Sequence, residues 1–243
     1  MTSDAMDRET LAAMIDQTLL KPNVGRIGGA EWIERNRDAG FATLCVSPFL
    51  VPVAARLLEG SCTKVCAVVG FPLGYALTET KAEEARRLVE LGAVEIDMVM
   101  NVGAFLDGET DLVARDIEAV ARAVCGATRA EGVLKVILET GHLTPEQIGQ
   151  AAQLAAKSCA DYVKTSTGFG PRGASVEDVR IMHDAVGAEV GVKAAGSIRD
   201  LPTALAMIAA GASRIGTSSG LEILAAFDRG EAGAAGAPEG SGY

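Results

Sequence analysis

Apolar and polar positions along the chain follow two alternating patterns. Short runs rich in β-branched residues have the length and bounding residues of strands, and the longer stretches between them repeat apolar residues at helical spacing. The predicted strands are 15–20, 41–47, 64–70, 95–101, 134–140, 162–167, 190–196 and 214–217. Stretches such as 81–91, 111–131 and 145–158 predict amphipathic helices between them. The pattern therefore predicts a strand–helix unit that repeats along the chain.

Residues at the ends of the helical stretches support these boundaries. Thr80 with Glu83, and Thr144 with Gln147, have the spacing of a capping box, in which a hydroxyl accepts a hydrogen bond from an amide that the helix leaves unpaired. Glycines such as Gly92 follow helical stretches at points where the chain must turn into the next strand. The sequence thus marks both where helices begin and where they end.

Strands that alternate with helices pair in parallel, and eight such units close most economically into a (β/α)8 TIM barrel of the α/β class. The 243 residues suit one such barrel. An open doubly wound sheet is the alternative, although no Gly-x-Gly-x-x-Gly motif follows an early strand. We expect a catalytic barrel domain at 1–230. Small and acidic residues dominate from Glu231 on, which predicts a flexible tail at 231–243 that ends in Tyr243.

The charge of the chain limits its partners. A formal net charge of −10 disfavours nucleic acid and anionic membranes, so any bound phosphate must be held by a local site. No apolar run approaches the length that crosses a bilayer, and residues 1–9 lack the basic and apolar regions of a secretory signal. We therefore expect a cytoplasmic protein whose partners are small molecules.

The cysteines do not form the pattern of a secreted disulfide framework. They are five in number and scattered, at Cys45, Cys62, Cys66, Cys125 and Cys159, so we expect free thiols. The spacing of Cys62 and Cys66 suggests metal ligands, but two histidines and no second cysteine pair make a four-ligand site hard to assemble. We expect no metal and no other cofactor.

Two lysines stand among apolar residues of the sixth and seventh predicted strands. Lys164 shares a strand face with Tyr162 and Ser166, and Lys193 has a similar place on the next strand. For either lysine alone, a strand end that faces water or an ion pair is an equally good explanation. Neighbouring parallel strands lie about 5 Å apart, however, so the two ammonium groups can share one pocket and each then favours the neutral form of the other. A neutral lysine is the form that acts as an amine nucleophile.

Acidic residues on other strands could complete such a site. Asp97 stands among apolar residues of the fourth predicted strand, and Asp16 on the first strand is a second candidate. A carboxylate beside an amine nucleophile can move the protons that imine chemistry requires. The structural alternative for Asp97 is an ion pair with a barrel lysine, and one carboxylate can have both roles.

Small residues follow the last three strands, at 167–168, 196–197 and 216–220. Backbone amides approach an anion closely where no Cβ intervenes, and barrels often bind phosphate after their last two strands. A single glycine turn is common in any barrel and indicates little. The prediction therefore depends on three such turns lying at one rim of the barrel. It points to a phosphate-binding site.

Five segments resemble the deoxyribose-phosphate aldolase family. They are 16–22, 95–99, 134–140, 162–169 and 191–196, and the resemblance extends through Gly220. It implies that Lys164 forms the Schiff base and that Asp97 and Lys193 transfer protons. The phosphate contacts it implies are Gly168, Gly196, Ser197, Arg199, Gly216, Ser218 and Ser219.

The resemblance also implies an activity. The reaction is that of a class I aldolase, which reversibly cleaves 2-deoxy-D-ribose 5-phosphate into acetaldehyde and D-glyceraldehyde 3-phosphate without a metal. A homo-oligomer is implied, with a dimer favoured. Some aldolases of this family also end in tyrosine, which makes Tyr243 a candidate for relaying a proton. Two positions depart from the family pattern: Gln17 replaces an expected histidine, and Ser197 replaces a second glycine in a tight turn.

Two other functions stay open at this stage. One is a Schiff-base barrel aldolase for a different phosphorylated sugar, which would share Lys164 but release another aldehyde. The other is a phosphate-binding barrel without covalent chemistry, such as an isomerase or a binding protein. Fold alone does not choose among them, because one fold hosts many functions.

Overall fold

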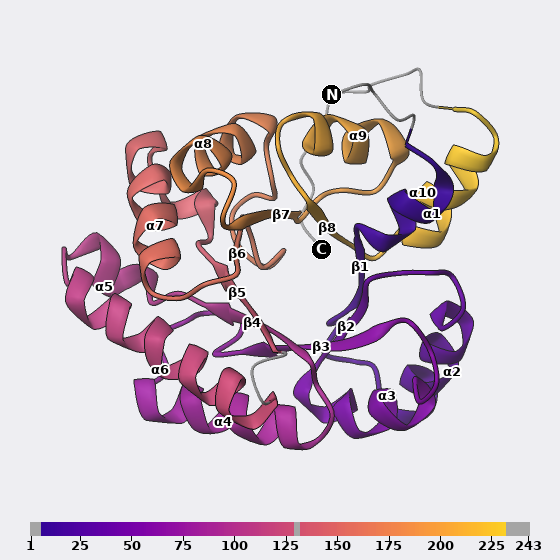
Figure 1. Ribbon diagram of the computed structural model, residues 1–243, viewed down its shortest axis with the longest axis horizontal. Coiled ribbons are helices and arrows are strands. Elements are labelled where there is room, and N and C mark those ends of the chain that lie inside the picture. The colour runs from indigo at the N-terminus through magenta and orange to yellow at the C-terminus, as the bar shows by residue number, and fades with distance from the viewer. Residues whose placement is uncertain (1–5, 129–131, 232–243) are drawn as a thin grey trace.

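A computed structural model of the chain describes residues 6–128 and 132–231. Within them, parallel strands form a closed barrel in sequence order, with β8 paired to β1. The strands are β1 (Ile15–Leu19), β2 (Thr43–Val46), β3 (Lys64–Val69), β4 (Glu95–Val99), β5 (Val133–Ile137), β6 (Tyr162–Lys164), β7 (Gly191–Ala195) and β8 (Arg214–Thr217). The ring of strands lies inside a ring of helices (Figure 1). The predicted (β/α)8 barrel is confirmed, and the open sheet is excluded.

Helices connect the strands and cover the outside of the barrel. They are α1 (Arg8–Ala13), α2 (Arg26–Asn36), α3 (Val51–Leu57), α4 (Thr78–Glu90), α5 (Val102–Leu106), α6 (Thr110–Thr128), α7 (Pro145–Lys157), α8 (Val176–Val186), α9 (Leu201–Ala209) and α10 (Gly220–Asp228), with short 3-10 turns η1 (Pro48–Leu50) and η2 (Thr140–His142). The tail from 232 on, with Tyr243, lies outside the described residues, so the expectation for it stays untested.

The two predicted capping boxes had different outcomes. At α7 the hydroxyl of Thr144 accepts a hydrogen bond from the backbone of Gln147, and the side chain of Gln147 accepts one in return, as predicted. The capping box of Thr80 with Glu83 was wrong. Helix α4 begins at Thr78 because the chain leaves its extended conformation at Leu77, so Thr80 already lies within the first turn.

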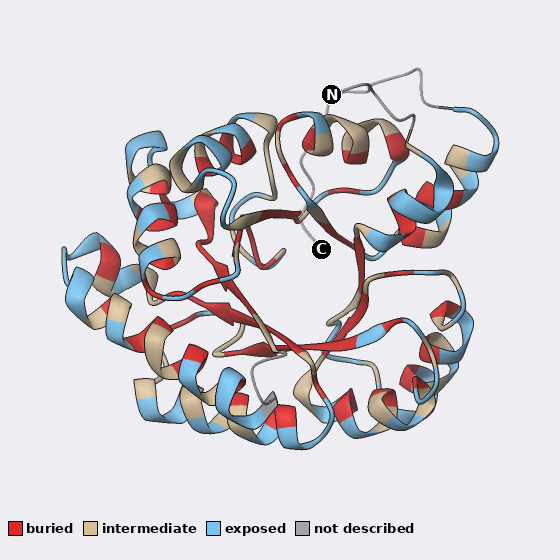
Figure 2. Cartoon of the chain, viewed as in Figure 1, coloured by how far each residue is buried: buried red, intermediate tan, exposed pale blue. Residues whose placement is uncertain are grey.

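The apolar core lies between the strands and the helices. Figure 2 shows the strands mostly buried, while the helices expose their outer faces. The inside of the barrel is different, because the side chains of Asp16, Lys135 and Lys193 are fully buried there. Burying charge is costly unless opposite charges and hydrogen bonds compensate it. The interior of this barrel is therefore the part of the fold that calls for a functional explanation.

The described chain contains no helix of the length and apolar character needed to cross a membrane.

Candidate active site

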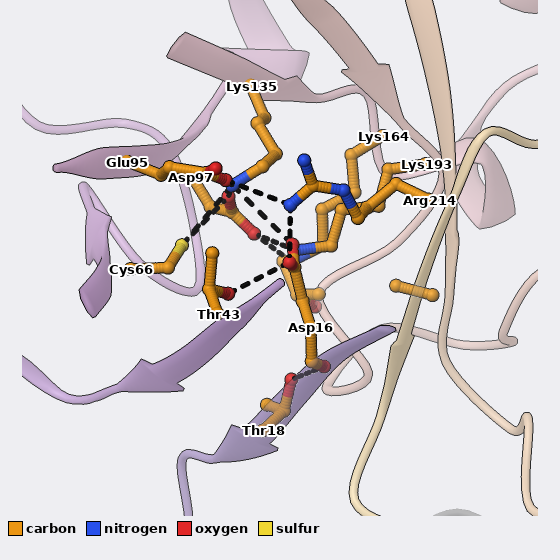
Figure 3. Close-up of polar contacts among 12 residues, drawn as sticks. Asp16, Thr18, Thr43, Cys66, Glu95, Asp97, Lys135, Lys164, Lys193 and Arg214 are labelled. Atoms are coloured by element: carbon orange, nitrogen blue, oxygen red, sulfur yellow. Dashed lines mark hydrogen bonds and ion pairs between the residues drawn. The ribbon is translucent and has the colours of Figure 1, made fainter. Parts of the chain in front are cut away.

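Charged side chains from six strands meet inside the barrel (Figure 3). Among the described residues, this cluster holds three carboxylates and four cationic groups, which we call the interior charge cluster. Its members are Asp16 on β1, Glu95 and Asp97 on β4, Lys135 on β5, Lys164 on β6, Lys193 on β7 and Arg214 on β8.

Asp97 is the centre of the interior charge cluster. Its Oδ2 accepts hydrogen bonds from the Nζ atoms of both Lys164 and Lys193, each at 2.7 Å. Its Oδ1 accepts one from Lys135 Nζ at 2.9 Å. Burial alone would raise the pKa of Asp97, but the ammonium groups of Lys135, Lys164 and Lys193 outweigh burial and hold that pKa well below its usual range. Asp97 is therefore an ionised carboxylate that joins three lysines.

The predicted pairing of Lys164 with Lys193 is confirmed as geometry. The two residues are register partners on neighbouring strands, and their ammonium groups share one carboxylate oxygen. The expected lowering of both pKa values was wrong for Lys193. Burial lowers the pKa of Lys193, yet the carboxylates of Asp16 and Asp97 outweigh it and raise that pKa above its usual range. Lys193 is thus held as a cation.

The three lysines differ in how many carboxylates they contact. Lys193 pairs with Asp16 and Asp97, and Lys135 pairs with those two and with Glu95. Lys164 has Asp97 as its one carboxylate partner among the described residues, and it alone of the three retains a small exposed fraction, 3%. Lys164 is therefore the lysine with the fewest carboxylate partners and the only one of the three with a measurable exposed fraction.

Three members of the interior charge cluster escaped sequence analysis: Glu95, Lys135 and Arg214. Glu95 and Asp97 lie two residues apart on β4 and so share a face, which was a usable signal. The Arg214 guanidinium donates to both Asp16 and Glu95. Asp16, the accessory candidate, is fully buried, with its pKa held below the usual range: burial raises it, but Lys135, Lys193 and Arg214 outweigh burial.

The residues expected to bind phosphate lie where the strands end. Gly168, Gly196 and Ser197 all have positive φ, at 86°, 91° and 62°, and so form tight turns after β6 and β7. Ser197 holds this left-handed conformation although it is not glycine. The backbone strain of such a residue is about 1–3 kcal/mol. The departure from the family pattern thus leaves the turn in place.

A cavity of about 900 Å³ opens beside these turns. Arg199 and Ser218, both expected to contact phosphate, line it. Lys21 also lines it and is a second cationic side chain there that sequence analysis did not assign. Ser219 lies just before helix α10 and donates its backbone N–H to Thr217 Oγ1 at 2.9 Å.

Gly216 lies in the predicted last strand, and its lack of a side chain has a consequence inside the barrel. It belongs to β8, and a Cβ added there would lie 2.8 Å from Ala195 Cβ and 3.0 Å from Lys193 Cε. Both distances are closer than carbon atoms normally approach. The missing side chain of Gly216 therefore makes room for Lys193.

Gln17, where histidine was expected, supports the loop after β8. Its side-chain amide donates to Asn36 Oδ1 at 3.0 Å and to the carbonyl of Ser218 at 3.3 Å, and its Oε1 accepts from the backbone of Gly220 at 2.9 Å. It therefore fixes the backbone of residues 218–220. This is a structural role outside the interior charge cluster.

In the described chain, Cys45, Cys66 and Asp97 are buried side chains whose potential metal-ligand atoms lie within 4.8 Å of one another. Cys66 thus meets Cys45 across β2 and β3 rather than the Cys62 that its spacing suggested. However, Cys66 Sγ lies 3.4 Å from Lys135 Nζ, and the Asp97 carboxylate is already engaged by three ammonium groups. A divalent cation would have to displace lysines. The arrangement is that of an ion-pair cluster, not of a preformed metal centre.

Comparison with known proteins agrees with this geometry. The model of the DeoC/LacD family aldolases matches residues 10–226. The deoxyribose-phosphate aldolase of Geobacillus sp. (strain WCH70) is 51% identical over 214 residues, which cover 88% of this chain and 94% of that protein. The deoxyribose-phosphate aldolase of Aciduliprofundum boonei is 49% identical over 221 residues, covering 90% and 97%.

A solved structure, described as the unique tetrameric structure of deoxyribose phosphate aldolase from Aeropyrum pernix, superposes with a TM-score of 0.83. It is 32% identical and the match covers 91% of this chain and 92% of that one. The resemblance found in the sequence is confirmed by all of these comparisons. The chain therefore belongs to the DeoC/LacD family of aldolases.

Proposed function

We propose that this aldolase reversibly cleaves 2-deoxy-D-ribose 5-phosphate into acetaldehyde and D-glyceraldehyde 3-phosphate through a Schiff base on Lys164. The observation that carries the proposal is the single carboxylate oxygen of Asp97 that Lys164 and Lys193 share inside the barrel. The interior charge cluster holds one more cation than carboxylates, and a buried excess of charge favours the loss of a proton. Lys164, with the fewest carboxylate partners, is the amine that we assign to this role.

The chemistry follows from these contacts. Neutral Lys164 adds to the open-chain aldehyde and, after loss of water, forms a protonated imine that withdraws electrons from the neighbouring carbons. Removal of the proton of the C3 hydroxyl then breaks the bond between C2 and C3 and leaves acetaldehyde as an enamine. Asp97 and Lys193 act as a pair in this proton transfer, directly or through water, because the low pKa of Asp97 makes the carboxylate a weak base by itself. Protonation of the enamine and hydrolysis release acetaldehyde.

The phosphate end of the substrate lies at the rim in this proposal. Arg199 and Lys21 provide positive charge on the walls of the 900 Å³ cavity, and the tight turns of Gly168 and Gly196 bring backbone amides to the same end of the barrel. Ser218 lines this cavity, and Ser219 follows it at the start of α10. Gly216, whose missing side chain makes room for Lys193, stays a predicted phosphate contact through its backbone.

We also propose that the chain self-associates, with a dimer as the expected form. The relative from Aeropyrum pernix is described as tetrameric, which supports association of some order. Sedimentation-velocity ultracentrifugation tests this, and a monomer at micromolar concentration would refute it. A cytoplasmic location remains part of the proposal, supported by five cysteines that are all unpaired.

Borohydride trapping tests the assignment of Lys164. The enzyme is incubated with acetaldehyde, reduced with borohydride and digested, and the peptides are mapped by mass. An ethyl group on Lys164 is the expected result, and Lys164→Met should show none. An ethyl group on Lys193 instead would reverse the roles, and no adduct on the wild type would remove covalent chemistry altogether. Analysis of the products from 2-deoxyribose 5-phosphate then separates this enzyme from an aldolase for another sugar.

A further inference from the structure

Ser166 carries a buried hydroxyl without a hydrogen-bond partner. Its side chain is fully buried, and its Oγ contacts no donor or acceptor among the described residues. Buried polar groups nearly always have a partner, so this hydroxyl calls for one that the free protein lacks. The hydroxyls on either side of it along the chain are engaged: Thr165 bonds the backbone of Ala195, and Thr167 bonds Glu139.

The place of Ser166 lies between the two ends of the proposed substrate. Ser166 comes two residues after Lys164, the last residue of β6, and so lies farther toward the rim at which the strands end. Its Cβ is 3.4 Å from where a Cβ on Gly196 would lie, so it borders the turn assigned to phosphate. The next residue, Thr167, already lines the 900 Å³ cavity. Ser166 thus stands between the imine and the phosphate.

We infer that Ser166 binds the C4 hydroxyl of 2-deoxyribose 5-phosphate, which is the C2 hydroxyl of D-glyceraldehyde 3-phosphate in the reverse reaction. The inference rests on the proposed function. With C1 on Lys164, the C3 hydroxyl at Asp97 and the phosphate at the rim, the C4 hydroxyl is the remaining polar group of the substrate. Along the substrate it lies between the C3 hydroxyl and the phosphate, as Ser166 lies between Lys164 and the turn of Gly196. A serine hydroxyl both donates and accepts, so it suits a hydroxyl partner.

The inference predicts selectivity between two acceptor aldehydes in the synthetic direction. D-glyceraldehyde 3-phosphate has the hydroxyl, and 3-oxopropyl phosphate has the same chain length and phosphate without it. Wild-type enzyme should prefer the first, because the second leaves Ser166 unpaired. In Ser166→Ala, kcat/KM should fall roughly 10- to 100-fold with D-glyceraldehyde 3-phosphate and stay within about twofold with 3-oxopropyl phosphate.

Matched measurements separate this role from a structural one. Removing an unpaired buried hydroxyl should not lower the melting temperature of Ser166→Ala, whereas Thr165→Val, which removes a hydroxyl with backbone partners, should lower it and reduce activity equally with both acceptors. Equal losses with both acceptors in Ser166→Ala would overturn the inference. So would a wild-type enzyme without preference between them, a result that needs no variant.

The test also distinguishes the inference from the proposed function. Acetaldehyde carries no hydroxyl for Ser166, so borohydride should trap it on Lys164 in Ser166→Ala as in the wild type. Trapping on Lys164 with no acceptor selectivity would overturn the inference and leave the proposed function standing. Failure of trapping in the wild type would instead overturn the proposed function.

Discussion

Lys135 offers the sharpest test of how the interior charge cluster works, because it is fully buried and contacts three carboxylates. Its Nζ lies 2.5 Å from Glu95 Oε2, 2.9 Å from Asp97 Oδ1 and 3.5 Å from Asp16 Oδ2. Burial lowers the pKa of Lys135, but these carboxylates outweigh burial and raise that pKa well above its usual range. Lys135→Met keeps an unbranched side chain, one atom shorter, and removes its charge.

Two effects of Lys135→Met can be worked out from the structure. Removing one partner of a buried ion pair costs about 3–5 kcal/mol of unfolding free energy, which lowers the melting temperature by roughly 6–20 °C in a chain of this size. The variant also leaves the cluster with as many cations as carboxylates. With one cation fewer beside it, the Asp97 carboxylate stabilises the ammonium form of Lys164 more strongly. Imine formation should therefore need a higher pH than in the wild type.

The assay follows both effects side by side. Calorimetry gives the melting temperature, and borohydride trapping of acetaldehyde across a pH series gives imine formation. The matched control is Lys81→Met, because Lys81 is equally buried and pairs with Asp116 at 2.5 Å, but at the contact of α4 with α6. It should lose similar stability and keep the wild-type pH profile. The charge argument fails if Lys135→Met is destabilised and yet traps acetaldehyde with the pH profile of Lys81→Met.

Four further changes test separate parts of the site. Gly216→Ala should cost about 1–3 kcal/mol by overpacking against Lys193 and should lower activity, as urea unfolding and turnover will show. Lys193→Leu should cut turnover at neutral pH and recover partly at higher pH; full activity at neutral pH would refute the paired-lysine account. Asp16→Asn should destabilise the protein at neutral pH. Because the pKa of Asp16 is lowered on folding, its contribution is present above its unfolded value, near 4, and is lost as pH falls, so urea unfolding of variant and wild type should converge in acid. Tyr243→Phe should slow deuterium exchange at the methyl group of acetaldehyde while trapping on Lys164 continues; unchanged exchange would remove the terminal phenol from the mechanism.

The sequence alone determined the strands, the barrel and the pairing of two lysines on neighbouring strands. Apolar strands that alternate with helices are expected to be parallel and in sequence order. Each helix carries the chain back to the end of the sheet at which the previous strand began. That order makes β6 and β7 neighbours, so the pairing of Lys164 with Lys193 could be predicted before any coordinates. Asp97 could be found as well, since a carboxylate among apolar strand residues needs a buried partner.

The tertiary structure decided which charges meet across the barrel and that the buried hydroxyl of Ser166 has no hydrogen-bond partner among the described residues. Lys135 and Arg214 received no role from the sequence, because the carboxylates that they contact come from β1 and β4. The rise in the pKa of Lys193 depends on the same carboxylates and reversed the shift expected from its neighbouring lysine. The free hydroxyl of Ser166 could not be read from sequence either. The sequence of a strand determines which face of the sheet each side chain points to. The contacts of that side chain depend on how the barrel closes and on which side chains the other strands place beside it.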